Sequence, residues 1–158
     1  MASSDRRHMI ESDGFFSEDD ANIGKQVDSM IQKGYPFPSV EGLDFLKRNT
    51  IEDERVRETI ESLFSWAGIG AYKIMGADPK KRIFCSIQNE RDEPYPFEAL
   101  NVYYWSTGSE VVFYKRSHRY PMHAKDASHG IKWLEVPYES LSVNDIEPEE
   151  RTLGSGGL

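Results

Sequence analysis

The chain has 158 residues, of which 38% are hydrophobic and 12% aromatic, a composition typical of a folded domain and not of a disordered chain. Its 19 basic and 27 acidic residues give a net charge of −8, which argues against a nucleic-acid partner because such binding requires a basic face. The single cysteine, Cys85, excludes an intrachain disulfide and favours a reducing, cytoplasmic location. The sequence contains no apolar run of about 18 residues, so we expect neither a membrane span nor a membrane partner.

The N-terminal part is predicted to begin with a tail and to continue as an amphipathic helix. Residues 1–14 are polar, charged and without periodicity, so we expect a flexible tail there, followed by a single domain over residues 15–158. Ser17 and the acidic residues after it resemble a helix-capping sequence, and Gly34 ends the predicted helix. The apolar positions on one face of this helix are Ile23, Val27, Met30 and Ile31.

Two more helices are predicted before residue 70. Ser39 is a candidate cap for a short second helix, whose apolar residues are Leu43, Phe45 and Leu46. Asn49 and Thr50 are both candidate caps for a third helix, which Gly68 weakens or ends. The apolar positions of the third helix are Val56, Ile60, Leu63, Phe64 and Ala67.

From residue 82 onward the pattern changes to that of β-strands. The strand candidates are residues 82–88, 99–105, 110–114 and 131–136, with a last strand within 144–153. The turn at residues 106–109 predicts that the second and third of these runs pair as an antiparallel hairpin. Residues 137–141 resemble a helical turn. Helices followed by an antiparallel sheet predict an α+β fold, with N-terminal helices packed on a curved sheet.

The densest group of chemically active residues is the segment 117–129, which holds three of the four histidines. His123, Asp126 and His129 are spaced by three residues, and a His/Asp/His set could bind Fe(II), Zn or Mn. Because this spacing is not an established metal signature, a solvated loop is the alternative interpretation. The three residues are candidate metal ligands.

Charge is distributed unevenly along the chain. Both ends are acidic, whereas residues 73–91 and 115–125 are basic. If Arg82 and Arg116 meet on adjacent strands, they could clamp the carboxylate or phosphate of a small organic ligand. The alternative is a solvated surface that balances the acidic ends.

Aromatic residues crowd the predicted sheet, and the alternation of a strand sends half of them to each face. One set forms the core, and the other either contacts the helices or lines a concavity suited to a flat organic ligand. From these patterns the candidate ligand-binding residues are Arg82, Tyr104, Arg116 and His118. No residue is assigned a catalytic role.

The predicted hairpin resembles a segment of the phytanoyl-CoA dioxygenase-like group. In that group a strand runs through a glycine turn into a second strand that ends in Gly-Ser-His and a basic residue. Here the corresponding stretch is Lys115-Arg-Ser-His-Arg119, with Arg116 in place of the glycine. Residues 130–137 and 156–158 are also similar to pieces of that group. The resemblance covers about residues 72–158.

The group comprises oxygenases that depend on Fe(II) and 2-oxoglutarate, so the resemblance implies a partial jelly-roll, cupin-like sheet and these two cofactors. Their iron centre needs a histidine with a carboxylate two residues later. The residues at that offset from the four histidines are Ile10, Tyr120, Lys125 and Ile131, and none is acidic. We therefore carry over no catalytic residue, and we expect a truncated or shortened relative without an intact iron site.

Three functional hypotheses follow. The leading one is a cupin-like small-molecule-binding or non-oxidative accessory module, with a small anionic organic ligand. The second is a metal-dependent enzyme that uses His123, Asp126 and His129. The third is a protein-interaction or homo-oligomerisation module, in which another copy or a partner covers an open sheet edge.

Overall fold

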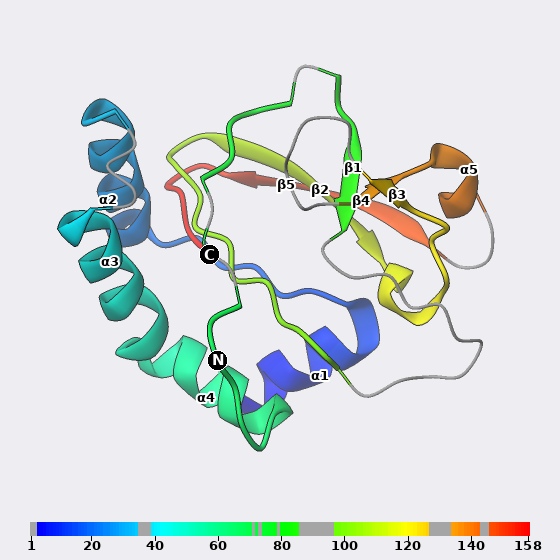
Figure 1. Cartoon of the computed structure of the whole chain (residues 1–158), viewed down its shortest axis with the longest axis horizontal. Coiled ribbons are helices and arrows are strands. Elements are labelled where there is room, and N and C mark those ends of the chain that lie inside the picture. The colour runs from blue at the N-terminus through cyan, green and yellow to red at the C-terminus, as the bar shows by residue number, and fades with distance from the viewer. Residues whose placement is uncertain are drawn as a thin grey trace.

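The computed structural model describes residues 3–34, 39–70, 72, 74–78, 80–85, 97–126, 134–142 and 146–158. The helices are α1 (Ser3–Asp13), α2 (Ala21–Gln32), α3 (Val40–Leu46), the π-helical turn η1 (Lys47–Ile51), α4 (Glu54–Leu63), the 3₁₀ turn η2 (Ser117–Arg119) and α5 (Tyr138–Leu141). The strands are β1 (Ile83–Cys85), β2 (Ser109–Lys115), β3 (Lys125–Asp126), β4 (Leu134–Val136) and β5 (Glu147–Leu153). Helices α1–α4 gather on one side and the strands on the other (Figure 1), so the α+β class is confirmed.

The predicted flexible tail is wrong, because residues 3–13 form helix α1. Its buried positions, Arg6 and Ile10, are four residues apart and therefore share one helical face. The Arg6 side chain donates from Nε to Thr59 Oγ1 at 3.1 Å and from Nη2 to Glu58 at 3.3 Å, which ties α1 to α4. The helix lacks an apolar stripe in the sequence because one of its two buried positions is an arginine.

Helices α2, α3 and α4 follow the predicted order, and each begins at a side-chain cap. The Asp20 carboxylate accepts from the N–H groups of Asn22 and Ile23, so Asp20 and not Ser17 caps α2. Ser39 caps α3 as predicted, accepting from Gly42 N–H at 3.0 Å. Asp53 caps α4. The two candidate caps that precede it, Asn49 and Thr50, lie instead within the π-helical turn η1.

The strands form two small antiparallel sheets, and the predicted hairpin is wrong. In one sheet β4 lies between β1 and β3. In the other, β2 pairs with β5 over its whole length, from Ser109 opposite Leu153 to Lys115 opposite Glu147. Trp105 makes an isolated bridge to Gly157, and residues 99–104 form no strand. Of the other expectations, strands at β1, β4 and β5 and a helical turn at α5 are confirmed, and residues 86–88, 131–133 and 144–145 of the predicted runs lie outside the described residues.

The C-terminal residues join the helical and the sheet regions. Glu18 and Leu158 exchange two backbone hydrogen bonds, of 2.7 and 3.1 Å. On the other side, Trp105 N–H donates to Gly157 O at 2.8 Å, and Gly157 N–H donates to Trp105 O at 3.2 Å. Residues 156–158 therefore lie as a short strand between the start of α2 and the segment before β2.

The buried apolar residues lie in two places, one near the strands and one in the helical region. Met122, Val136 and Ile146 form a buried cluster under the strands. In the helical region Ile23 is 1% exposed, and Phe45 and Val56 are also buried. None of the helices in the described part of the chain has the length and apolar character needed to cross a membrane.

Candidate functional site

The two arginines of the predicted anion clamp lie at the ends of strands in different sheets. Arg82 precedes β1, and Arg116 follows β2, so the premise that they stand on adjacent strands is wrong. Arg82 donates from Nε and Nη2 to the Asp78 carboxylate at 3.0 and 3.2 Å, and its Nη1 lies 3.7 Å from Glu135. The hydrogen bonds from Arg82 lower the pKa of Asp78 to about 2. Arg116 pairs with Glu147 at 3.0 Å.

Tyr104 faces the helices. Its hydroxyl donates to the carbonyl of Asn49 at 2.5 Å and lies 2.7 Å from Thr50 Oγ1, and its ring meets Phe45 edge-on at 5.2 Å. Burial raises the pKa of Tyr104 to about 12. Contact with the helices is one of the two alternatives predicted for the aromatic residues, and Tyr104 follows it. Its hydroxyl donates to a backbone carbonyl of the π-helical turn η1.

The neighbours of Tyr104 point elsewhere, as strand alternation predicts. Tyr103 and Trp105 stack on each other with ring centroids 5.5 Å apart. Burial raises the pKa of Tyr103 to about 12, with a smaller contribution from Cys85. Although residues 99–104 form no strand, Tyr104 contacts the helices while Tyr103 and Trp105 contact each other.

His118 lies against the end of α1. Its Nε2 is 3.3 Å from the carbonyl oxygen of Glu11, and its ring stacks on Phe97 at 6.0 Å. The Nδ1 atom of His118 is buried without a hydrogen-bond partner among the described residues. The four predicted ligand-binding residues are therefore engaged in four separate places, and the contacts of the structure do not bring them together.

The predicted metal ligands are only partly within the described residues. His123 is exposed and has a left-handed backbone, with φ of 47°, and Asp126 is exposed on β3. His129 lies outside the described residues. Within the described ranges no group of three metal-ligating side chains comes together. The metal hypothesis rests on His129 and stays a prediction.

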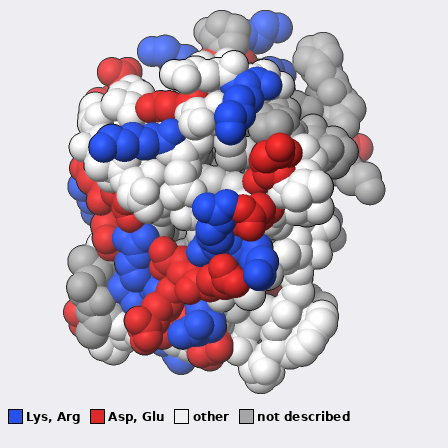
Figure 2. Space-filling model, turned by 90° about the vertical axis from the view of Figure 1, so that its left-hand side faces the viewer, with Lys and Arg blue, Asp and Glu red and all other residues white. Residues whose placement is uncertain are grey.

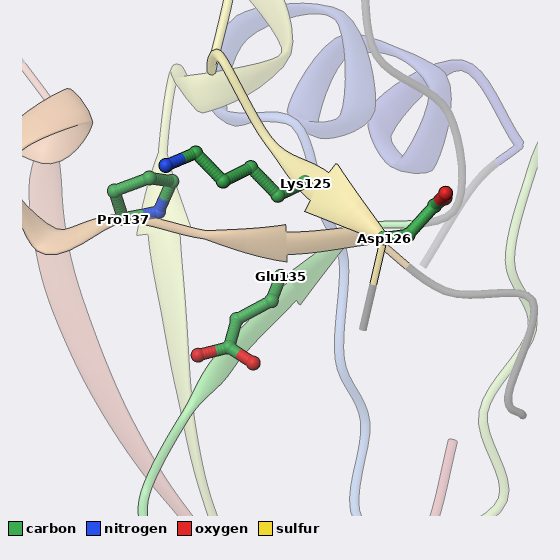
Figure 3. Close-up of a pocket in the computed structure, with 4 residues that line it drawn as sticks. All are labelled: Lys125, Asp126, Glu135 and Pro137. Atoms are coloured by element: carbon green, nitrogen blue, oxygen red, sulfur yellow. The ribbon is translucent and has the colours of Figure 1, made fainter. Parts of the chain in front are cut away.

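A pocket opens where β3 meets β4. It has a volume of about 310 Å³ and is lined by Lys125, Asp126, Glu135 and Pro137 (Figure 3). Lys125 stands opposite Glu135 in the β3–β4 register. In Figure 3 the Lys125 side chain extends toward Pro137, whereas the carboxylate of Glu135 points to the other side. Among the described residues the Lys125 ammonium has no ion-pair or hydrogen-bond partner.

Lys125 differs in this respect from three other basic residues on or beside the strands. Lys115 pairs with Asp13 and Glu149, and the two predicted clamp arginines are paired as described above. A ligand anion at those positions would have to displace an intramolecular carboxylate. At Lys125 it would not, so the pocket beside Lys125 is the candidate ligand site.

These features were compared with known proteins. No family model, curated protein or solved structure matches the chain. The relationship to the phytanoyl-CoA dioxygenase-like group therefore stays a prediction, and the candidate site rests on its own geometry.

Sequence reasoning missed a polar cluster that is centred on Arg55. Its guanidinium reaches Glu18 at 3.0 Å and both cap residues Asp20 and Asp53 at 2.8 Å. These three carboxylates raise the pKa of Arg55, chiefly through the hydrogen bond to Asp53. Only the Asp53-x-Arg55 spacing, which lets one residue cap a helix and bind the arginine, signals the cluster in the sequence. On the helical side of the molecule acidic and basic side chains interleave (Figure 2), which fits a structural role for these charges.

Proposed function

We propose that this protein is a small-molecule-binding module that holds an anionic organic ligand in the pocket between β3 and β4. The observation that carries the proposal is the Lys125 ammonium, which has no partner among the described residues and lines a pocket of about 310 Å³. A volume of this size suits a small metabolite. A lysine acts as a compact point charge for a carboxylate or phosphate.

The wider proposal is a cupin-like accessory module without oxidative chemistry. It is supported by the resemblance of the sheet region and by the lack of a His-x-Asp or His-x-Glu pair in the 158 residues. If the resemblance extends to function, Fe(II) and 2-oxoglutarate are the cofactors it implies. A non-oxidative module and an active oxygenase differ in whether bound 2-oxoglutarate is consumed.

Calorimetric titration with 2-oxoglutarate and, separately, with inorganic phosphate tests the site. We expect binding that weakens about tenfold or more in Lys125→Ala, because the cation facing the ligand is lost. Lys80→Ala is the matched control, since Lys80 is also exposed but lies outside the pocket. Equal affinity in wild type and Lys125→Ala, or no binding of either anion at millimolar concentration, would overturn the proposed site.

The same samples test the oxidative alternative. With Fe(II) added, a non-oxidative module leaves 2-oxoglutarate unchanged, and mass spectrometry of the mixture shows no succinate above the level of a protein-free control. Stoichiometric Fe(II) binding with turnover of 2-oxoglutarate would instead assign an oxygenase activity.

A second candidate is a protein-interaction module, favoured by the exposed apolar residues after α4. Residues 65–70 are all exposed, and Trp66 is 83% exposed. An exposed aromatic side chain of this size is typical of a contact surface. Light scattering at several protein concentrations checks this candidate, and a strict monomer across the range would count against self-association.

A further inference from the structure

The C-terminal end of helix α1 is fastened to the residues that follow β2. His118 Nε2 lies 3.3 Å from the carbonyl oxygen of Glu11, and Arg119 Nη2 donates to the same oxygen at 3.0 Å. The backbone N–H of Arg116 also donates to the carbonyl of Asp13 at 2.8 Å. Basic side chains at this position satisfy carbonyl groups that the last turn of a helix leaves unpaired.

The contact with Glu11 places a proton on Nε2 of the His118 ring, because a carbonyl oxygen only accepts hydrogen bonds. In the neutral ring Nδ1 then keeps its lone pair, whereas in the charged ring Nδ1 is a second donor. Nδ1 is buried and has no hydrogen-bond partner among the described residues. Gly14 packs directly on it, since a Cβ at Gly14 would overlap Nδ1, and Phe97 covers the ring. The site is therefore built for a neutral imidazole.

We propose that His118 is an acid-sensitive latch that docks the C-terminal end of α1 when neutral and releases it when protonated. A second proton would bind at Nδ1 and place an N–H donor against Gly14, where none of the described residues supplies an acceptor. Opening exposes the ring to water, which supplies the missing acceptor. The released segment includes Gly14 and Phe15, which stacks on Phe113 of β2 at 4.2 Å.

The charges around the ring favour the neutral state on balance. Burial lowers the pKa of His118 and the nearby Arg119 cation lowers it further, whereas the Glu11 carbonyl and the Asp13 carboxylate raise it. Asp13 is itself neutralised in part by Lys115, 3.7 Å away. Other charged side chains on the surrounding elements include Arg7, which holds the Glu11 carboxylate, Arg116, which holds Glu147, and the exposed Glu98.

The direction of the pH dependence follows from this balance. The docked state has a His118 pKa below the ordinary value of 6.5, so the open state binds a proton more readily. Docking is complete above pH 6.5 and is lost as the pH falls below it. A single proton limits the loss to about tenfold in the docking equilibrium for each pH unit.

Hydrogen exchange of the α1 amides between pH 8 and pH 5, corrected for the intrinsic pH dependence of exchange, tests the latch in the full chain. We expect protection in the last turn of α1 to fall as the pH drops below 6.5. His118→Gln keeps a donor near the Nε2 position but does not titrate, so its corrected protection is expected to be independent of pH in this range. His8→Gln, on the exposed face of α1, is the matched control and retains the wild-type dependence.

A second measurement uses the wild-type protein and so does not require the His118→Gln variant to fold. Nitrogen-15 NMR of wild-type His118 is expected to show the Nε2–H tautomer and a titration midpoint below pH 6.5. Arg119→Gln removes a neighbouring cation and is expected to move that midpoint upward. A wild-type midpoint at or above 6.5, or α1 protection that responds to pH equally in His118→Gln and wild type, would overturn the latch.

Discussion

The helical region and the sheet region are held together by different kinds of contact. Between residues 3 and 63 polar side chains do much of the positioning. Buried Arg6 and Asn49 and the ion pair of Arg55 with Asp20 link one helix to another, and aspartates cap α2 and α4. The sheets consist of strands of two to seven residues over a core cluster of Met122, Val136 and Ile146. Helices α2 to α4 therefore begin at local capping signals, whereas the contacts between helices, like the strand pairings, join segments that are distant in the sequence.

The short C-terminal strand, residues 156–158, connects the helical region to the sheet region. It hydrogen bonds to Glu18 and Asp20 on the helical side and to Trp105 on the sheet side. Its close approach to α2 requires glycine on both sides, because a Cβ at Gly24 would overlap the Ser155 carbonyl.

The largest expected effect is therefore that of Gly24→Ala. Overpacking at this contact separates the C-terminal strand from α2, and we expect a loss of about 3 kcal/mol in the free energy of unfolding. Urea denaturation followed by circular dichroism measures it. Gly70→Ala is the matched control, since a Cβ there, apart from its chain neighbours, would meet no atom of the described residues within 4 Å. A Gly24→Ala protein as stable as the control would show that the two regions are not joined at this contact.

Arg55→Met tests the polar contacts of the helical region. It leaves Glu18, Asp20 and Asp53 close together without their shared cation, and we expect a loss of about 2 kcal/mol, measured by urea denaturation. Arg57→Met on the same helix is the control, because Arg57 is more exposed and lies 3.9 Å from Glu54. A surface pair of this kind contributes less than about 1 kcal/mol.

The loss in the free energy of unfolding caused by Arg55→Met should become smaller at low pH. Burial raises the pKa of Asp20 and Asp53, but hydrogen bonds from Arg55 and from helix N–H groups outweigh it and leave both below 3.8. Carboxylates with a lowered pKa stabilise the fold above pH 3.8, and this stabilisation is lost as the pH falls. The stability difference between wild type and Arg55→Met is expected to narrow below pH 3.8. A constant difference down to pH 3 would contradict the ion-pair origin.

The same contrast explains which parts of the fold were predictable. Helices α2 to α4 were found because apolar spacing is a local signal, and Ser39 was recognised as a cap for the same reason. Helix α1 was missed because its buried face includes Arg6, whose partners are more than fifty residues away. The β2 partner was misassigned because the true partner, β5, has the polar sequence Glu-Pro-Glu-Glu-Arg-Thr-Leu. Strand pairing depends on where distant segments meet, which composition does not reveal.

The candidate site was less predictable than the fold. Residue type identified Arg82, Arg116 and His118 as chemically capable, but each has an intramolecular partner supplied by a segment distant in sequence or by a near neighbour such as Asp78. Lys125 was noted only as one charge in a basic stretch. Lys125 combines an ammonium without a partner among the described residues with a position on the pocket wall, and only a three-dimensional arrangement can show that combination.

Tyr104→Phe examines a single contact between the two regions. The hydroxyl that donates to Asn49 O and lies beside Thr50 is removed, while the ring and its packing on Phe45 remain. We expect a loss of about 1 kcal/mol in the free energy of unfolding, the usual contribution of one hydrogen bond. Tyr138→Phe is the control, because Tyr138 is 62% exposed and its hydroxyl bonds at the surface. Equal stabilities of the two variants would show that the η1 turn does not depend on Tyr104.

Trp66→Ser is expected to have the smallest effect on stability. The Trp66 side chain is 83% exposed, so its removal should change the free energy of unfolding by less than about 0.5 kcal/mol at low protein concentration. Its fluorescence should be quenched by acrylamide as readily as that of free tryptophan, and Trp66→Ser removes that accessible component. A concentration-dependent loss of quenching in wild type would show that another copy covers this residue, because self-association removes Trp66 from water without changing the fold. Residues 65–70, which follow α4, would then form a contact surface supported by the helical and sheet regions.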